Sequence, residues 1–138
     1  MDLTGTIHQA MPFCAQLGVR GVTWEPDLVE LELDWHESLC TTGGLVHGGV
    51  LMALADSCGA ACAAVNLPEG ATGTSTIESK TNFLGAVREG TVRAVSRPLH
   101  AGSSTIVIET ELRVVDGGVL GKLVGKTTQT QSVLRPRA

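Results

Sequence analysis

The chain has 138 residues and a formal net charge of −4 at pH 7, with 10 Lys and Arg against 14 Asp and Glu. This length fits one domain over residues 1–138 with a hydrophobic core of its own. The acidic balance, the lack of any Lys or Arg run and the scarcity of aromatic residues argue against a nucleic-acid partner. No stretch is apolar for long enough to cross a bilayer and none has the pattern of a signal peptide, so we expect a cytoplasmic protein without a membrane partner.

The first 35 residues predict a short helix and two strands. Residues 1–16 suggest a frayed start with a short helical segment near Pro12–Gln16, and Leu17–Trp24 is predicted as a strand. A turn at residues 25–27 leads to a second strand, Leu28–Trp35. That strand alternates between an apolar and an acidic face: Val29, Leu31, Leu33 and Trp35 against Glu30, Glu32 and Asp34. We therefore expect a half-buried antiparallel hairpin with a solvated acidic face that binds no metal.

A long helix is predicted after the polar loop of residues 36–46. The stretch Leu45–Val65 is LVHGGVLMALADSCGAACAAV, in which Ala, Leu and Met dominate from Val50 onwards and nothing stops a helix. Its length would be roughly 25–30 Å. Apolar residues occur all round it, which predicts a helix buried on every side. One face suits packing against a sheet: Leu51, Leu54, Cys58, Ala61 and Val65.

Four strands are predicted after a turn-rich connection over residues 66–73. They are Thr74–Phe83, Thr91–Arg97, Ser103–Val115 and Val119–Val133. The first is expected to place one set of side chains on one side: Ser75, Ile77, Ser79, Thr81 and Phe83. We expect a turn at 85–90, a break at Leu99–Gly102, a hairpin turn at Asp116-Gly117-Gly118 and a loose tail over 134–138.

Two strands, one long helix and four strands predict an α+β fold with an antiparallel sheet of five to six strands. A single sheet of that size covers only one side of a buried helix. The other side of the helix then needs a second subunit, so a homodimer is expected.

The four cysteines could bind metal or be structural. Cys58 and Cys62 lie one helical turn apart, which could suit two metal ligands. No second Cys or His pair at ligand spacing follows, and His47 falls more than two turns away. We therefore predict buried reduced thiols and no metal site.

Asp56 is the only carboxylate of the predicted helix. At 100° per residue it shares its face with mostly small residues: Gly49, Met52, Ala53, Gly59, Ala60 and Ala63. That face could simply pack closely against another backbone, yet a carboxylate kept despite the cost of burial is often functional. His47-Gly48-Gly49 begins the helix, where free N–H groups and the helix dipole favour an oxyanion. An oxyanion two turns from a carboxylate on one face is an acyl-transfer geometry.

The segments HGGVLMALAD and TSTIESKTNFLGAVREG closely resemble those of the hotdog-fold acyl-CoA thioesterases. The branch is that of the phenylacetate-pathway thioesterase and of the 4-hydroxybenzoyl-CoA thioesterase that carries its carboxylate on the central helix. The likeness covers nearly the whole chain, from about Leu17 to Val133. It implies a hotdog fold with the sheet wrapped round the helix, sheets paired edge to edge in a homodimer, and often a homotetramer built as a dimer of dimers.

The resemblance implies a role for each residue of the helix region. Asp56 would be a general base on water or a nucleophile that gives a mixed anhydride, and general base is predicted because Asp is shorter than the Glu of some relatives. Gly49 N–H is the predicted oxyanion donor. His47 is an orienting group, with direct chemistry as the alternative. Thr41 stands where relatives carry Asn or Gln, and its hydroxyl can do part of that work. Ser75 aligns with a residue that orients the water, with Thr74 as the alternative.

Other residues match substrate-binding positions of the family. Gly48 lies at the helix start, and Met52, Ala53 and Ala60 are expected to line the acyl end. The segments Gly73–Glu78, with Thr74 and Thr76, and Gly102–Val107 match CoA-lining positions of the family, and Ser103 and Ser104 are expected to contact phosphate or the pantetheine arm. Arg88 and Arg97 are candidates for the nucleotide phosphates.

The predicted function is therefore that of a hydrolase, an acyl-CoA thioesterase acting on an aryl or medium-chain acyl group, with no cofactor because CoA is part of the substrate. The sequence lacks the G-x-S-x-G motif, which counts against a serine hydrolase. Two alternatives remain. A hotdog dehydratase or hydratase would pair the acid with a histidine, but His36 and His100 lie in no recognisable hydratase motif. A non-catalytic acyl-CoA binding module would fit the departure at Thr41.

Overall fold

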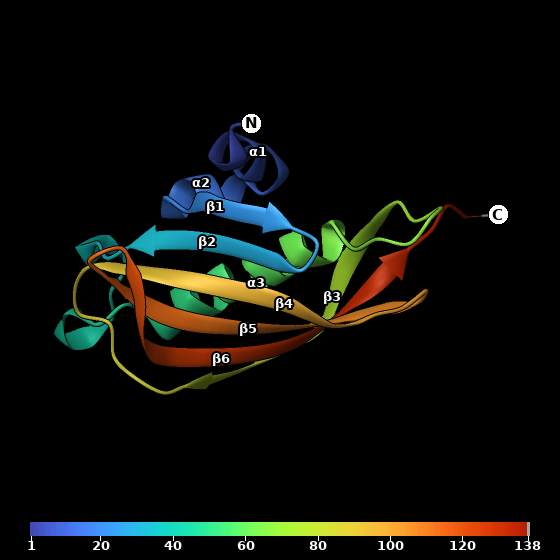
Figure 1. The fold of residues 1–138 in the computed structure, drawn as a ribbon. Coiled ribbons are helices and arrows are strands. Elements are labelled where there is room, and N and C mark those ends of the chain that lie inside the picture. Colours follow the sequence, from blue (N-terminus) through green and yellow to red (C-terminus); the bar gives the residue numbers. More distant parts are fainter. Residues whose placement is uncertain (138) are drawn as a thin grey trace.

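The protein is an α+β structure in which a six-stranded antiparallel sheet curls round one long helix, as the sequence predicts (Figure 1). The computed structural model describes residues 1–137. The strand order is β1-β2-β4-β5-β6-β3. The elements are α1 (Leu3–Ala10), α2 (Pro12–Leu17), β1 (Arg20–Glu25), β2 (Leu28–Asp34), α3 (Gly48–Ala64), β3 (Gly73–Phe83), β4 (Thr91–Ala101), β5 (Thr105–Asp116) and β6 (Val119–Leu134). Two short 3-10 turns, Glu37–Leu39 and Thr42–Gly44, precede α3.

The helix α3 packs on the sheet through the predicted face. Leu51, Leu54 and Cys58 are almost wholly buried there. The expectation that the helix is buried on every side is wrong for the single chain, because Gly49, Met52 and Ala64 are exposed on the outer side. The sheet curls round only part of the helix and leaves the side with Gly49 and Met52 open, next to Asp56. Within residues 1–137, no helix is both long and apolar enough to span a membrane.

The N-terminal segment is more regular than the predicted frayed start. The Asp2 carboxylate accepts a hydrogen bond from Gly5 N–H (3.0 Å), which caps α1. Ile7 of α1 is 1% exposed and belongs to the core. The second helix ends at Gly18 (φ +73°), so β1 begins three residues later than predicted. Figure 1 shows α1 and α2 lying beside β1, at one edge of the sheet.

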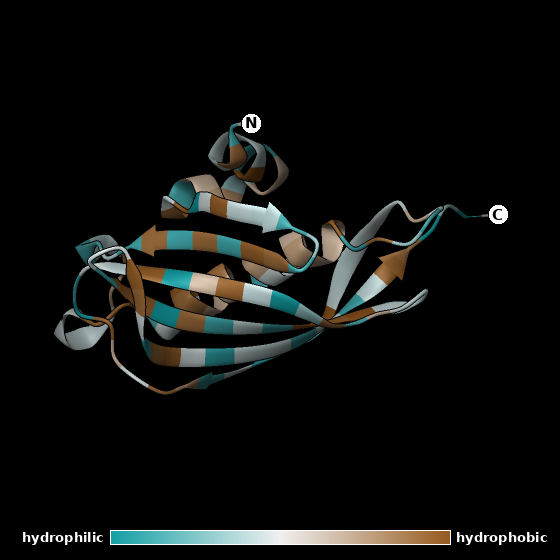
Figure 2. Ribbon diagram, viewed as in Figure 1, coloured by the Kyte–Doolittle hydropathy of each residue, from teal (hydrophilic) through white to brown (hydrophobic). Residues whose placement is uncertain are grey.

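The alternation predicted for β2 is confirmed, and its colours alternate in Figure 2. Its apolar residues are buried, but the acidic face is not simply solvated as expected. Arg93 of β4 pairs with both Glu30 and Glu32, and Arg20 of β1 pairs with Glu32 and Asp34. These cross-strand ion pairs neutralise the acidic face, because the neighbouring strands bring guanidinium groups that one strand's sequence does not reveal.

Several register shifts within the sheet were not predicted, and two of them concern β3 and β4. The pairing of β3 with β6 shifts register between Thr76 and Glu78, and that of β4 with β5 shifts between Pro98 and His100. The break predicted at Leu99–Gly102 is therefore a bulge, and β4 continues to Ala101. The shift at Ile77 also changes which β3 side chains share a face. The predicted single set from Ser75 to Phe83 is wrong for this reason.

The last hairpin forms as predicted, with Gly117 (φ +57°) and Gly118 (φ +81°) in its turn. Beyond β6, the tail is partly fixed, since Arg135 donates hydrogen bonds to the carbonyl oxygens of Glu69 and Ser103. Ala138 lies outside the described residues. The inner face of β6 carries buried polar side chains: Thr127, Gln129 and Gln131.

All four cysteines are free, and Cys14, Cys58 and Cys62 are buried, which confirms the prediction of buried thiols on α3. Burial raises the pKa of Cys58 to about 12 and that of Cys62 to about 11. These thiols are therefore protonated and unreactive packing groups.

Candidate active site

Asp56 is partly buried and lies on the side of α3 that faces the inner surfaces of β3 and β6. Its Oδ1 accepts two hydrogen bonds, from the Thr76 hydroxyl (2.9 Å) and from the Gln129 side-chain amide (3.0 Å). The carboxylate thus has one oxygen fixed by donors from two strands. Its Oδ2 has no hydrogen-bond partner among the side chains of residues 1–137.

A shallow pocket of about 270 Å³ surrounds this carboxylate. It is lined by residues of α3 and β3: Gly49, Met52, Ala53, Asp56, Thr76 and Ser79. Five of these six were predicted from the sequence as site residues, and Ser79 was not. One water molecule takes about 30 Å³ in the liquid, so the pocket has room for a thioester group and an attacking water.

The helix start is capped by its own histidine. The Nδ1 atom of His47 accepts a hydrogen bond from Gly49 N–H (2.8 Å), so the neutral ring carries its proton on Nε2. This contact agrees with an orienting role for His47. It also means that Gly49 N–H is not the free donor that the sequence led us to expect.

Thr41 and Gly48 line a neighbouring pocket of about 370 Å³, together with Leu51 and Phe83. Thr41 N–H bonds to the carbonyl of Leu45 (2.7 Å), which fixes the loop before the helix. Within one chain Thr41 therefore does not line the Asp56 pocket. Its predicted role at the thioester stays a prediction.

Ala60, one turn beyond Asp56, lines a third hollow of about 190 Å³ between α3, α1 and β1. Its walls are entirely apolar: Ile7, Ala10, Met11, Trp24, Ala60, Ala61 and Ala64. The indole N–H of Trp24 donates to the Ala61 carbonyl (2.9 Å), which holds that wall in place.

Ser75 does not point at Asp56 in this chain. It pairs with Ser132 and Thr76 with the buried Gln131, and paired residues of antiparallel strands share a face. Thr76 is therefore on the helix side and Ser75 on the outer side. The residue that contacts Asp56 is Thr76, one position beyond the prediction, and neither Ser75 nor Thr74 lines the pocket.

The predicted CoA contacts lie far from one another in one chain. Arg88 precedes β4 and bonds to the Gly43 carbonyl (3.3 Å), whereas Ser103 and Ser104 follow its end. An 11-residue strand is roughly 35 Å long, which separates the two groups. Arg97 lies on the outer face of β4, next to the buried, inward-facing Ser96. Their roles in CoA binding, and that of Gly102 in the same turn, stay predictions.

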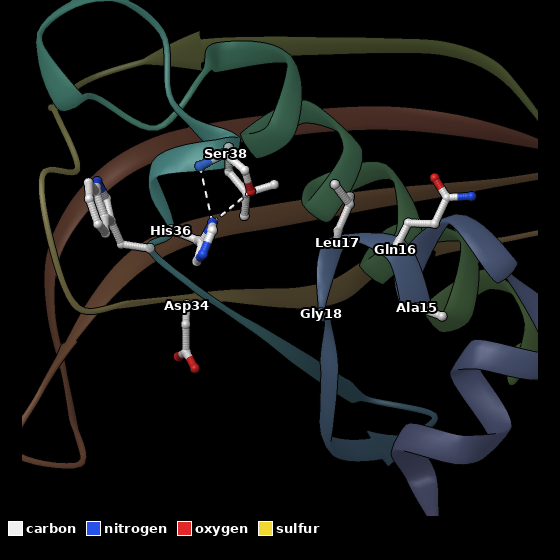
Figure 3. A pocket seen from close by; sticks show the side chains of 9 residues that line it. Ala15, Gln16, Leu17, Gly18, Asp34, His36 and Ser38 are labelled. Carbon is white, nitrogen blue, oxygen red and sulfur yellow. Dashed lines mark hydrogen bonds between the residues drawn. The ribbon is translucent and has the colours of Figure 1, made fainter.

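A larger hollow of about 520 Å³ lies elsewhere, between the end of α2 and the end of β2. Figure 3 shows His36 bonded to Ser38 on one side of it and Leu17 on the other. The Asp34 carboxylate there is engaged by Arg20 and Thr91. The Asp34 carboxylate and the His36 Nδ1 atom thus already have partners in this hollow, which leaves the Asp56 pocket as the candidate site.

The sequence interpretation missed Gln129 and Gln131, which lie directly beneath the site. Their signal was available, because the inward positions of the last strand alternate as Thr127, Gln129 and Gln131 where apolar residues are expected. Polar residues at buried strand positions need partners, and a carboxylate on the facing helix is such a partner.

Comparison with known protein families gives a match to the thioesterase superfamily over residues 43–120, a range that includes the helix start, Asp56 and β3. A candidate esterase of Saccharolobus solfataricus is 32% identical over 109 residues, which is 79% of this chain and 76% of that protein. The 1,4-dihydroxy-2-naphthoyl-CoA hydrolase of Escherichia coli is 39% identical over 69 residues, half of each chain.

Solved structures share the whole fold. A thioesterase from Haemophilus influenzae superposes with a TM-score of 0.86 at 24% identity, over 98% of this chain and 92% of that one. A Mycobacterium tuberculosis candidate esterase gives a TM-score of 0.84 at 24% identity, over 93% of this chain and all of that one. At this identity the likeness concerns the hotdog fold itself.

Proposed function

The chain belongs to the thioesterase superfamily and is a thioester hydrolase, and we propose that its substrate is an aryl or medium-chain acyl-CoA and that Asp56 carries the chemistry. The observation behind this proposal is the Asp56 carboxylate itself. It stands in a pocket on the open face of α3, with Oδ1 held by two donors and Oδ2 without a partner among the described side chains. A fixed carboxylate with one free oxygen is the arrangement that a general base needs.

In the proposed reaction Asp56 Oδ2 takes a proton from a water molecule as the water oxygen attacks the thioester carbonyl carbon. The carbonyl oxygen becomes an oxyanion. The C–S bond then breaks, and the CoA thiolate leaves and takes up a proton, giving free acid and CoA. The alternative, direct attack by Asp56 to form a mixed anhydride, uses the same oxygen.

Gly49 N–H is the proposed oxyanion donor, although His47 Nδ1 occupies it in this structure. A thioester oxygen would have to displace the imidazole, which costs about 1 kcal/mol, the typical worth of one helix cap. One oxyanion donor stabilises the transition state by about 3 kcal/mol. The exchange is therefore favourable in the transition state.

The apolar hollow beside Ala60 supports the proposed acyl class. It is one helical turn from Asp56, and its volume of about 190 Å³ exceeds the roughly 150 Å³ of an engineered apolar cavity that binds benzene. An aryl ring or a medium-length chain would fit there. That one relative is a 1,4-dihydroxy-2-naphthoyl-CoA hydrolase supports an aromatic acyl group, while membership of the phenylacetate and 4-hydroxybenzoyl branch stays a proposal.

A second copy of the chain is the proposed cover for the open face. β3 is an edge strand, and several large apolar side chains near it are exposed: Met52 (39%), Ile77 (61%), Phe83 (50%) and Leu84 (54%). Unpaired edges with apolar side chains favour association. We propose a homodimer through this edge, with a dimer of dimers as a further step.

Hydrolysis of a panel of acyl-CoA thioesters tests the function. Release of CoA thiol from aryl and medium-chain substrates, several times faster than from acetyl-CoA, is the expected result. Tight binding without release would indicate an acyl-CoA binding module. Addition or loss of water at the acyl chain, with the thioester intact, would indicate a hydratase or dehydratase.

A further inference from the structure

Two glutamine side chains are buried beneath α3, in a core that is otherwise mostly apolar. Gln129 is 0% exposed and Gln131 is 1% exposed. Both lie on the inner face of β6, where their partners on β5 are the buried Ile108 and Ile106. Burying a primary amide among apolar side chains costs free energy unless its hydrogen bonds are satisfied. These amides should therefore serve a specific neighbour.

Both amides lead to Asp56. The Nε2 atom of Gln129 donates directly to Asp56 Oδ1 (3.0 Å). The Nε2 atom of Gln131 donates to the Thr76 hydroxyl oxygen (2.7 Å), and that hydroxyl donates to the same Oδ1 (2.9 Å). A hydroxyl has one proton to give, so the donor order from Gln131 through Thr76 to Asp56 is fixed.

The two amides are oriented so that their NH2 groups donate toward Asp56 and Thr76, while their own oxygens are left without a hydrogen bond. Within the described residues, the Oε1 atoms of Gln129 and Gln131 are buried without a hydrogen-bond partner. Turning the Gln129 amide over would place its oxygen against a carboxylate oxygen, which is repulsive. The free-energy cost of two buried oxygens without hydrogen bonds is thus offset by the two hydrogen bonds that the amides donate to Asp56 and Thr76.

The central helix makes room for this contact. A side chain at Gly59 would place its Cβ 2.1 Å from the Gln129 amide oxygen. Gly59 lies three residues beyond Asp56, one turn along the same helix. The missing side chain lets the buried amide lie against the helix backbone and reach Asp56.

From this geometry we infer that Gln129 and Gln131 are positioning residues for the reaction, a conclusion that rests on the proposed function. Gln129 acts directly and Gln131 acts through Thr76. Together they fix Oδ1 of Asp56 and leave Oδ2 for the attacking water of the proposed reaction. Neither glutamine touches the substrate, and both should affect the rate of the chemical step more than substrate binding.

Replacing each amide by an apolar side chain of similar length removes one donor. Gln129→Met should lower kcat by about ten- to a hundredfold, because a hydrogen bond to a charged group is lost. KM should change by less than about twofold. Thr76→Val should lower kcat similarly, whereas Thr76→Ser, which keeps the hydroxyl, should stay near the parent. Thr76 is exposed, so this pair remains folded even if a glutamine variant does not.

Gln129 contacts Asp56 directly and Gln131 contacts it only through Thr76, and this difference gives a sharper test. Gln131→Met should lower kcat in the parent protein but have no further effect in the Thr76→Val background, because its path to Asp56 is already broken. Gln129→Met should lower kcat in both backgrounds, because its contact is direct. A general loss of core packing would give additive effects in both.

Thr127→Val is the matched control. Thr127 is also buried on the inner face of β6 and is hydrogen-bonded, but to Thr81 (2.7 Å) and not to Asp56. This variant should lower the melting temperature without changing kcat per folded molecule. If Thr76→Val and both glutamine variants keep the parent kcat while Asp56→Asn is inactive, the positioning role is refuted and the proposed function stands. If Asp56→Asn is as active as the parent, the proposed function itself fails.

Discussion

Asp56→Asn is the substitution that most directly tests the chemistry at this site. Asn has nearly the same shape as Asp, and its side-chain oxygen can accept the two hydrogen bonds that Thr76 and Gln129 now give to Oδ1. Its NH2 group would then stand where Oδ2 is, facing the pocket. The variant therefore keeps the surrounding contacts but can neither take a proton from water nor attack a carbonyl carbon.

The expected loss is a fall in kcat of roughly 10²–10⁴, the usual contribution of a positioned acid–base group, or about 3–5 kcal/mol of barrier. KM should change little, because the acyl group and CoA contact other residues. The melting temperature should hold or rise slightly, since a neutral amide is cheaper to bury than a carboxylate without a cationic partner. Among the described side chains, no Lys, Arg or His pairs with Asp56.

The assay is CoA release on the best substrate of the panel, with melting temperature measured on the same preparation. Asp34→Asn is the matched control, because Asp34 is bonded to Arg20 and Thr91 and lies outside the Asp56 pocket. That variant should lose a little stability and no activity. An Asp56→Asn protein that melts lower than the parent but retains its kcat would refute the catalytic role and make Asp56 a packing residue.

Three further predictions concern the helix start, the buried cysteines and the assembly of the protein. Gly49→Val should lower turnover at least about tenfold with the fold retained, because a Cβ there lies 2.9 Å from His47 Nδ1 and obstructs the thioester; unchanged kinetics would remove Gly49 from the site. In native protein only Cys40 should react quickly with a thiol reagent, and fast labelling of all four cysteines would contradict the burial of the other three. Folding raises the pKa of Cys58 and Cys62 above the ordinary value of 9.0, so these thiols stabilise the fold below pH 9. That stabilisation is lost as the pH rises, and the free energy of unfolding should therefore fall between about pH 9 and 12. Light scattering should give at least twice the 14.3 kDa chain mass, and Ile77→Lys at the β3 edge should weaken the assembly; active protein at the chain mass would exclude the dimer.

The elements with a strong internal period were predictable from the sequence. Strand β2 alternates over its whole length, and α3 is a run of good helix formers, so both appear within two or three residues of their predicted ends. The helix α1 was missed because its sequence, LTGTIHQA, has weak helix formers and only one fully buried residue. Its stability comes from the Asp2 cap and from packing on β1, and only the second of these needs the tertiary structure.

The geometry of the site was only partly predictable, because it depends on register. Asp56, Gly49, Met52 and Ala53 follow from helical spacing alone and do meet in one pocket. Which residue of β3 faces Asp56 depends on the irregularity at Ile77, which no alternation pattern reveals. Because this irregularity could not be foreseen, the sequence predicted Ser75 beside Asp56, whereas Thr76 is the residue that contacts it. A strand that keeps strict alternation cannot place both Thr76 and Ser79 on one face, and this one does.

The glycines of α3 have a second explanation besides access for a ligand. Side chains at three of them would meet other residues of the same protein: Phe83 lies 3.1 Å from a Cβ at Gly48, His47 Nδ1 2.9 Å from one at Gly49, and the Gln129 oxygen 2.1 Å from one at Gly59. Each glycine therefore admits a side chain that shapes the site. The Asp56 carboxylate is thereby held by Gln129 before a substrate binds, whereas the hydrogen bond from Gly49 N–H to His47 would have to open for the proposed oxyanion. In the proposed reaction this pre-organisation would lower the cost of aligning Asp56 with water, and it would account for glycine at positions where helix propensity alone favours alanine.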